Sequence, residues 1–177
     1  MTDLIGVVPD RAAPDAAAVL RIEQFKRVMG RYPTGVVVLA TTVDGEPHGM
    51  AVNSFTSLSL DPMLVLFCVD RASTTWPHVR RAGRFAVSVL GAGQQEVCRT
   101  FARRGADRFN GVGWSANHSG QPVLHEAVAW LDCVTTAIHP GGDHLIVVAE
   151  VLRAEDRDGG APLVFHRGRL SALTEAA

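Results

Sequence analysis

The chain is poor in cysteine and in long apolar runs, and each shortage excludes a class of protein. Its 177 residues include only three cysteines, Cys68, Cys98 and Cys133. They are odd in number, widely spaced and set among apolar residues, so we expect buried reduced thiols and neither a disulfide framework nor a metal site. No apolar run approaches the ~18 residues that span a bilayer, and no signal peptide is evident. We therefore expect a cytoplasmic protein with no membrane association.

An excess of charge and the common nucleotide motifs are also missing. The 17 basic and 18 acidic residues give a net charge of −1, which argues against nucleic acid or a membrane surface as partner. There is no Walker A sequence, no G-x-S-x-G elbow and no H-E-x-x-H, and residues 91–96 depart from G-x-G-x-x-G at the last position. A dinucleotide is therefore not bound in the Rossmann manner. A Ser-His-Asp triad assembled in space is left open, because triads are recognised by geometry.

The remaining pattern predicts one domain built mainly of strands. Residues 1–19 are rich in Ala, Pro and Asp and are expected to form a flexible arm, and residues 20–177 a single domain. Helical periodicity appears at residues 20–31 and 94–101, and Ser73 is expected to cap a short helix near Trp76. Turn residues separate short β-rich runs, with strands expected at residues 36–43, 48–60, 63–69, 85–90, 129–138, 145–152 and 163–166. Residues 103–120 are expected to be irregular. The pattern predicts a mainly β fold, an antiparallel barrel with short flanking helices, and argues against a parallel doubly wound sheet.

The residues that carry chemistry gather at positions 48–75, which read HGMAVNSFTSLSLDPMLVLFCVDRASTT. Asn53, Ser57 and Ser59 alternate with apolar neighbours, so we expect a strand with one face on the core and one face on a groove. Residues 63–69 contain no polar member and predict a central strand buried on both faces. Small hydroxyl and amide groups followed by a turn containing Arg71 suit a polyhydroxylated, phosphorylated ligand.

The chain resembles the short flavin reductases of two-component monooxygenases, which share the FMN-binding split-barrel fold of Greek-key type. The resemblance covers residues 22–173. Its most specific blocks are N-S-F-T-S at 53–57 and G-D-H at 142–144, about 90 residues apart. Other matching blocks are F-K-R at 25–27, Y-P-T-G-V at 32–36, C-V-D-R at 68–71, R-F-N-G at 108–111 and P-L-V-F at 162–165.

The resemblance implies two sets of binding residues and no catalytic residue or metal, because the cofactors carry the chemistry. The flavin set consists of Thr34, Ala51, Val52, Asn53, Ser54, Ser57, Ser59, Cys68, Val69, Asp70, Arg71, Ser73, Thr75, Arg108 and Phe109. The nicotinamide nucleotide set consists of Asp143, His144 and Phe165. The competing interpretations are a solvated strand face for residues 53–59, a helix cap with a solvated arginine for residues 70–75, and a plain strand-entry turn for residues 142–144.

The activity implied is hydride transfer from NADH, with NADPH as an alternative, to FAD or FMN. Reduced flavin would then diffuse to a separate oxygenase or halogenase, and the reductase is expected to be a homodimer. Two alternatives stay open. One is a split-barrel oxidase with tightly bound FMN, and the other is a non-catalytic module that binds flavin or haem.

Overall fold

The computed structural model describes residues 16–105, 107–157 and 160–173, and the rest of the predicted arm lies outside these ranges. Helix α1 begins at Ala16, inside the predicted arm. The described elements are α1 (Ala16–Met29), β1 (Thr34–Gly35), β2 (Val37–Val43), β3 (Glu46–Val52), β4 (Thr56–Leu60), β5 (Met63–Asp70), α2 (Trp76–Ala82), β6 (Arg84–Val89), α3 (Gln95–Ala102), β7 (Trp114–Ala116), β8 (Pro122–Leu124), β9 (Ala129–Gly141), β10 (His144–Asp156), β11 (Leu163–His166) and β12 (Arg169–Ala172). None of these helices is long and apolar enough to cross a bilayer.

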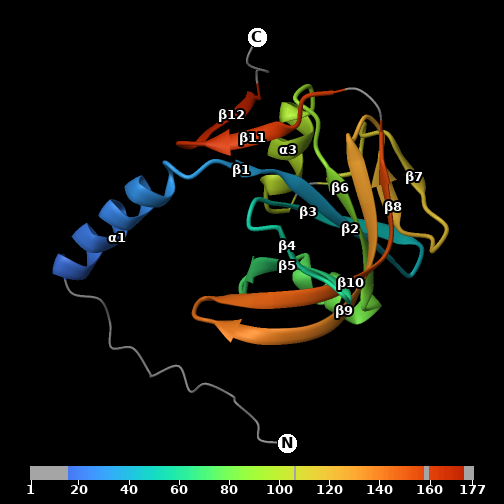
Figure 1. The fold of residues 1–177 in the computed structure, drawn as a ribbon, viewed down its shortest axis with the longest axis horizontal. Coiled ribbons are helices and arrows are strands. Elements are labelled where there is room, and N and C mark those ends of the chain that lie inside the picture. The colour runs from blue at the N-terminus through green and yellow to red at the C-terminus, as the bar shows by residue number, and fades with distance from the viewer. Residues whose placement is uncertain (1–15, 106, 158–159, 174–177) are drawn as a thin grey trace, which may run out of the picture.

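The main sheet has seven strands in the order β3-β2-β6-β9-β10-β5-β4, and every neighbouring pair is antiparallel. It curls so that the β9–β10 hairpin lies below β2 and β3 (Figure 1). A small sheet, β1-β11-β12, and the pair β7-β8 complete the described strands. The β2–β3 connection is a two-residue hairpin turn: Asp44 and Gly45 both adopt positive φ, as a type I′ turn requires. The prediction of a mainly antiparallel β fold with short helices is confirmed.

Two layers of apolar side chains hold the fold together, one on each side of β2. Inside the curled sheet, Leu39 packs with Phe67 and Phe85. On the other face of β2, Val38 packs with Phe101 of α3 and Leu163 of β11. A continuous β-branched run is the pattern of a strand buried on both faces, and β2 is that strand.

Two predictions about neighbouring strands are wrong. The predicted strand 48–60 is two strands, because residues 53–55 form a bend between β3 and β4. On β4, Leu58 and Leu60 are exposed and do not face the core. Strand β5 does have a neighbour on each side, but buried and part-exposed residues alternate along it. Only one face of β5 packs inside the sheet, and its other face stays partly exposed, with no described helix or second sheet packed on it.

Other local predictions need correction. The region 103–120 contains β7, and β8 follows it. Thr75, not Ser73, occupies the N-cap position of α2, although the Ser73 hydroxyl still accepts a hydrogen bond from the backbone N–H of Trp76 at 3.2 Å. The short strands β1, β7, β8 and β12 were not predicted, because runs of two to four residues show no period.

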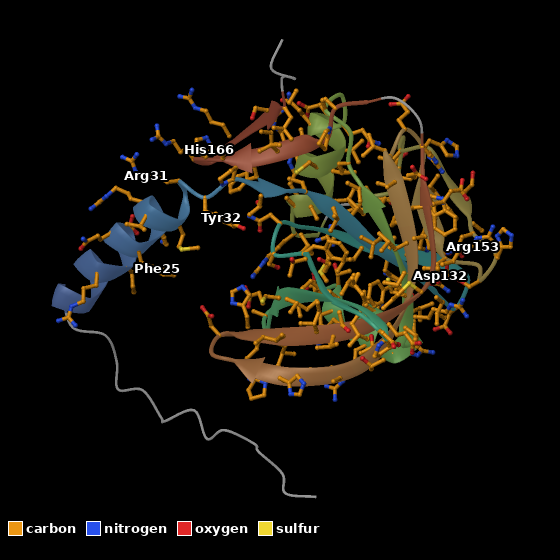
Figure 2. All side chains as sticks on the ribbon, viewed as in Figure 1. Phe25, Arg31, Tyr32, Asp132, Arg153 and His166 are labelled. Carbon is orange, nitrogen blue, oxygen red and sulfur yellow. The ribbon has the colours of Figure 1, made fainter. Side chains whose placement is uncertain are left out.

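An ion pair between the buried Asp132 and the part-exposed Arg84 crosslinks β6 and β9 in the wall of the barrel. Asp132 (Figure 2) accepts hydrogen bonds from Arg84 Nε at 3.1 Å and Arg84 Nη2 at 2.6 Å. Its Oδ1 atom also accepts from the Ser119 hydroxyl at 3.0 Å. Burial alone would raise the pKa of Asp132, but the hydrogen bonds from Arg84 and Ser119 outweigh it and hold the pKa below its ordinary value.

Candidate functional site

An open cleft of about 330 Å³ lies where the ends of β3 and β5 approach the start of α2 and the end of α3. The curled sheet is open on this side, because its two edge strands, β3 and β4, are not paired with one another. Its volume lies within the range of small-molecule sites. The lining residues are Met50, Ala51, Val52, Asn53, Ser54, Cys68, Val69, Asp70, Ser73, Thr74, Thr75, Phe101, Ala102, Arg104, Arg108 and His144.

The cleft brings together most of the residues singled out in the sequence, although they come from segments up to about 90 residues apart. Those in its lining are Ala51, Val52, Asn53, Ser54, Cys68, Val69, Asp70, Ser73, Thr75, Arg108 and His144. Those outside its lining are Thr34, Ser57, Ser59, Arg71, Phe109, Asp143 and Phe165. Sequence reasoning missed Met50, Thr74, Phe101, Ala102 and Arg104. Its alternation with Val52 along β3 could have pointed to Met50, whereas Arg104 lines the cleft only because α3 ends there.

The Ser54 side chain joins the bend after β3 to strand β5. Its hydroxyl donates to the carbonyl of Cys68 at 3.0 Å and accepts from the backbone N–H of Cys68 at 2.9 Å. A serine hydroxyl has one hydrogen to donate, so Ser54 has none left for a ligand and keeps one lone pair. Its first role is therefore to fix the two edges of the cleft relative to one another.

The floor and rim near α2 are also held by internal bonds. Asp70 Oδ1 accepts from the backbone N–H of Ala72 at 2.8 Å, and its Oδ2 lies 3.6 Å from Arg104 Nη2. The Ser73 hydroxyl lies 3.7 Å from the sulfur of Met50 on β3. These contacts shape the turn between β5 and α2, and they leave Arg104, whose side chain is 70% exposed, beside the cleft.

Arg108 is the cation set most deeply in the cleft. Its Nη1 donates to the Gly49 carbonyl at 2.5 Å and to the Thr75 hydroxyl, and its Nε and Nη2 donate to the Arg103 carbonyl. All these partners are neutral oxygens, and no carboxylate among the described residues pairs with Arg108. Burial lowers the pKa of this guanidinium, which stays charged at neutral pH. An uncompensated, partly desolvated positive charge favours an anionic ligand.

The G-D-H block forms the tight turn of the β9–β10 hairpin. Gly142 has φ of +78° at the first turn position, where a type II′ turn requires glycine. Arg71, the residue after β5, fixes this turn, because its backbone N–H donates to the Asp143 carbonyl at 3.1 Å and its Nε donates to the Gly142 carbonyl at 3.0 Å. Arg71 is thus a support for the hairpin and does not line the cleft.

His144 is the residue of this hairpin that reaches the cleft, where it lies opposite Asp70 in the strand register. Its Nδ1 is 2.8 Å from Asp143 Oδ1, a contact that lowers the pKa of the Asp143 carboxyl. With Nδ1–H donated to Asp143, Nε2 is directed elsewhere and is free to contact a ligand.

Three predicted positions do not line the cleft: two lie in the small β1-β11-β12 sheet, and one lies in the 103–120 loop after α3. Thr34 and Phe165 face one another in the β1–β11 pair, and the buried Thr34 hydroxyl makes no hydrogen bond with another described residue. Phe109 packs edge-on against Phe101, with ring centres 5.0 Å apart, and against Trp114. Phe109 therefore anchors the 103–120 loop on α3.

Fold and cleft define a curled antiparallel β protein with one polar ligand site rich in small hydroxyl groups and arginine. The flavin reductase like domain model matches residues 29–174, so the chain belongs to the flavin reductase-like family. Structural neighbours give the fold as a split barrel.

Known relatives come from several bacteria. A flavin reductase of Pseudomonas putida is 44% identical over 145 residues, which cover 81% of this chain and 85% of that protein. The reductase subunit of a flavin-dependent monooxygenase from Rhodococcus jostii is 37% identical, covering 89% of this chain and 81% of that protein. The solved structure of a Streptomyces globisporus NADH:FAD oxidoreductase, in complex with NAD and FAD fragments, superposes with a TM-score of 0.83 at 39% identity, covering 89% of this chain and 94% of that one.

Proposed function

We propose that this chain is an NAD(P)H-dependent flavin reductase that supplies reduced flavin to a partner monooxygenase or halogenase. The observation that carries the proposal is the cleft at the open side of the barrel, where the ends of β3 and β5 and the β9–β10 turn meet beside Arg104 and Arg108. Membership of the flavin reductase-like family and the similarity to a monooxygenase reductase subunit support it.

The flavin is held mainly by backbone and small polar groups. Residues 51–53 and 69–70 present backbone N–H and C=O groups to the ring edge and the ribityl chain, and the Asn53 amide and the Thr74 hydroxyl add side-chain partners. Arg108 and Arg104 supply positive charge for the phosphate. The cleft fits such a ligand because it combines these polar groups with the Phe101 ring and the unpaired charge of Arg108.

The nicotinamide nucleotide is the second substrate and approaches from the β9–β10 turn. His144, oriented by Asp143, donates or accepts a hydrogen bond at the nicotinamide or phosphate portion. Hydride passes directly between the two bound rings, so the protein aligns them and excludes water without a nucleophile or general acid. NADH is favoured over NADPH, because no pair of arginines in the cleft lining lies free of other contacts to receive a 2′-phosphate.

A second copy of the chain completes the active form. The apolar stripe of α1 is uncovered: Phe25 is 65% exposed and lies apart from the barrel (Figure 2), and Val28 is 59% exposed. Tyr32, three residues after the end of α1, is 69% exposed. Exposed large apolar side chains on one helix are typical of a subunit interface. Phe25→Glu is expected to shift the protein from dimer to monomer in analytical ultracentrifugation, and a wild-type monomer would contradict the proposal.

The decisive experiment follows NADH oxidation at 340 nm with added FAD, with added FMN and with no flavin. Oxidation that requires added flavin and saturates with it supports a reductase with diffusible flavin. Oxidation by a yellow preparation without added flavin would instead indicate the oxidase-like alternative with bound FMN. Flavin binding without oxidation of NADH or NADPH would indicate a non-catalytic binding module.

A further inference from the structure

A hollow at the end of α1 shares no lining residue with the flavin cleft and has no role in the function described above. Its volume is about 440 Å³, within the range of small-molecule sites. It lies where the last turn of α1 meets the turn between β11 and β12. Its lining residues are Lys26, Arg27, Gly30, Arg31, Arg167 and Gly168. Four of these six residues carry a positive charge and none carries a negative one.

The β11–β12 turn is fixed on the end of α1. The backbone N–H of Arg167 donates to the Gly30 carbonyl at 2.9 Å. A Cβ atom at Gly30 would lie 3.1 Å from the Lys26 carbonyl oxygen and 3.8 Å from the Arg167 Cα, so the lack of a side chain here leaves room for the turn. Arg31 and His166 lie near this junction (Figure 2). The two walls of the hollow are therefore held in place relative to one another.

The positive charges of the hollow are largely uncompensated. Lys26 Nζ lies 3.0 Å from Glu23 Oε1, and Lys26 and Arg27 also face the negative end of the α1 dipole. Arg31 and Arg167 lie beyond the helix. Among the described residues, no carboxylate forms an ion pair with Arg27, Arg31 or Arg167. Like charges around one hollow repel each other, so a multiply charged anion would be favoured there.

Arg167 occupies a turn position that favours other residue types. Arg167 and Gly168 connect the paired residues His166 and Arg169, and their φ angles are +50° and +74°. This is a type I′ turn, whose first position favours asparagine, aspartate or glycine. A positive φ is unfavourable for a residue with a long side chain. The arginine does not help the turn, and its guanidinium is available to a ligand in the hollow.

We propose that this hollow binds a small anion that carries adjacent phosphate groups. Three of the four cations are arginines, whose planar guanidinium groups form paired hydrogen bonds with phosphate oxygens. The surface is concave, which favours a small molecule over the surface of an acidic protein. The net charge of −1 argues against nucleic acid or a membrane as the source of the phosphate. The inference does not depend on the proposed function, because the hollow and the flavin cleft are separate.

The test measures binding of inorganic pyrophosphate by isothermal titration calorimetry at low ionic strength. Wild type is expected to bind it saturably, with an affinity that falls as sodium chloride is added. Arg167→Asn should bind about tenfold more weakly, since it loses one charge-assisted contact. Asparagine suits the first position of a type I′ turn, so this variant should melt at the same temperature as wild type or higher. Unfolding is thereby excluded as the cause of weaker binding.

Arg153→Asn is the matched control. Arg153 is exposed on β10, on the side of the molecule away from α1 (Figure 2), and its replacement changes the net charge by the same amount. This variant should bind pyrophosphate as wild type does. Wild type is also titrated in the presence of FMN, because the flavin cleft contains arginines of its own. Pyrophosphate binding should persist there.

Four results would overturn the proposal. They are no saturable binding by wild type, equal binding by wild type and Arg167→Asn, loss of binding when FMN is present, and tighter binding of a hexaglutamate peptide than of pyrophosphate. The third result would place the anion in the flavin cleft, and the fourth would assign the hollow to an acidic protein partner. None of these measurements follows NADH oxidation, so their outcome is distinct from a failure of the proposed reductase activity.

Discussion

Replacing Ser54 by alanine should lower the stability of the fold and weaken flavin binding, because the Ser54 hydroxyl joins the bend after β3 to β5 at the open side of the barrel. The substitution removes a hydrogen bond donated to the Cys68 carbonyl and one accepted from the Cys68 N–H. No other side chain joins the bend after β3 to β5 in this way among the described residues. Without it, the segment 53–55 is free to move relative to β5.

The magnitude follows from the two lost bonds. Each intramolecular hydrogen bond contributes about 0.5–1.5 kcal/mol net, and the half-buried position of Ser54 and Cys68 lets water replace part of this. We expect a loss of about 1–2 kcal/mol in the free energy of unfolding. For a chain of this size that corresponds to a fall in Tm of about 2–8 °C. The flavin dissociation constant should rise several-fold, because residues 53 and 54 line the cleft.

The assay is thermal unfolding followed by circular dichroism, together with flavin titration, for Ser54→Ala and Ser57→Ala. Ser57 is the matched control, since it is exposed on β4 and its hydroxyl bonds to no other described residue. Ser57→Ala should leave both quantities unchanged. A Tm within about 1 °C of wild type for Ser54→Ala would refute the reasoning, because the bridge would then contribute less than one ordinary hydrogen bond.

Three further predictions concern the core, the ion pair and the hairpin. Gly49→Ala should destabilise by about 1–3 kcal/mol in urea unfolding, because a Cβ atom would lie 2.7 Å from Phe101 Cε1, whereas Gly93→Ala meets no atom within 4 Å and should be neutral. Asp132→Asn should cost about 2 kcal/mol at pH 7 in the same assay. The pKa of Asp132 is lower in the folded protein than in the unfolded chain, so the carboxylate contributes fully to stability above its unfolded pKa of about 3.9. This contribution disappears as the pH falls through the folded-state pKa. A difference in unfolding free energy between wild type and Asp132→Asn that is as large at pH 2 as at pH 7 would contradict this. His144→Ala should raise the KM for NADH several-fold with little change in the flavin constant, and a larger effect on flavin would reassign the residue; His139→Ala, exposed on β9, is the control.

The sequence predicted the strands whose patterns depend on local contacts. Alternation, β-branched runs and the Asp44-Gly45 turn located most of the main sheet, because these signals are set within one strand or hairpin. The face each strand buries depends on what covers it, and this was misjudged for β5. Its apolar residues 63–69 resemble those of β2, yet only β2 has α3 and β11 packed on its outer face.

The candidate site was predicted as a set of positions but not as a set of roles. Residues 51–54, 68–70 and His144 meet in one cleft, as the resemblance to flavin reductases implied. Arg71 and Phe109 do not line the cleft: Arg71 bonds to the β9–β10 turn, and Phe109 packs on Phe101 and Trp114 and so holds the 103–120 loop. Residue type alone does not separate these roles, since an arginine suits a phosphate and a backbone carbonyl equally well.

Several polar side chains of the cleft bond to the protein itself and are not free to bond to a ligand, and this affects how tightly the flavin is held. The polar side chains of Ser54, Asp70 and Ser73 are already engaged in internal bonds within the cleft lining. Recognition therefore falls to backbone groups, a few remaining side-chain groups and the charge near Arg108. Such a site is preorganised but offers few directed bonds, so it is suited to a ligand that must leave after reduction. This accords with the proposal that the flavin acts as a diffusible substrate.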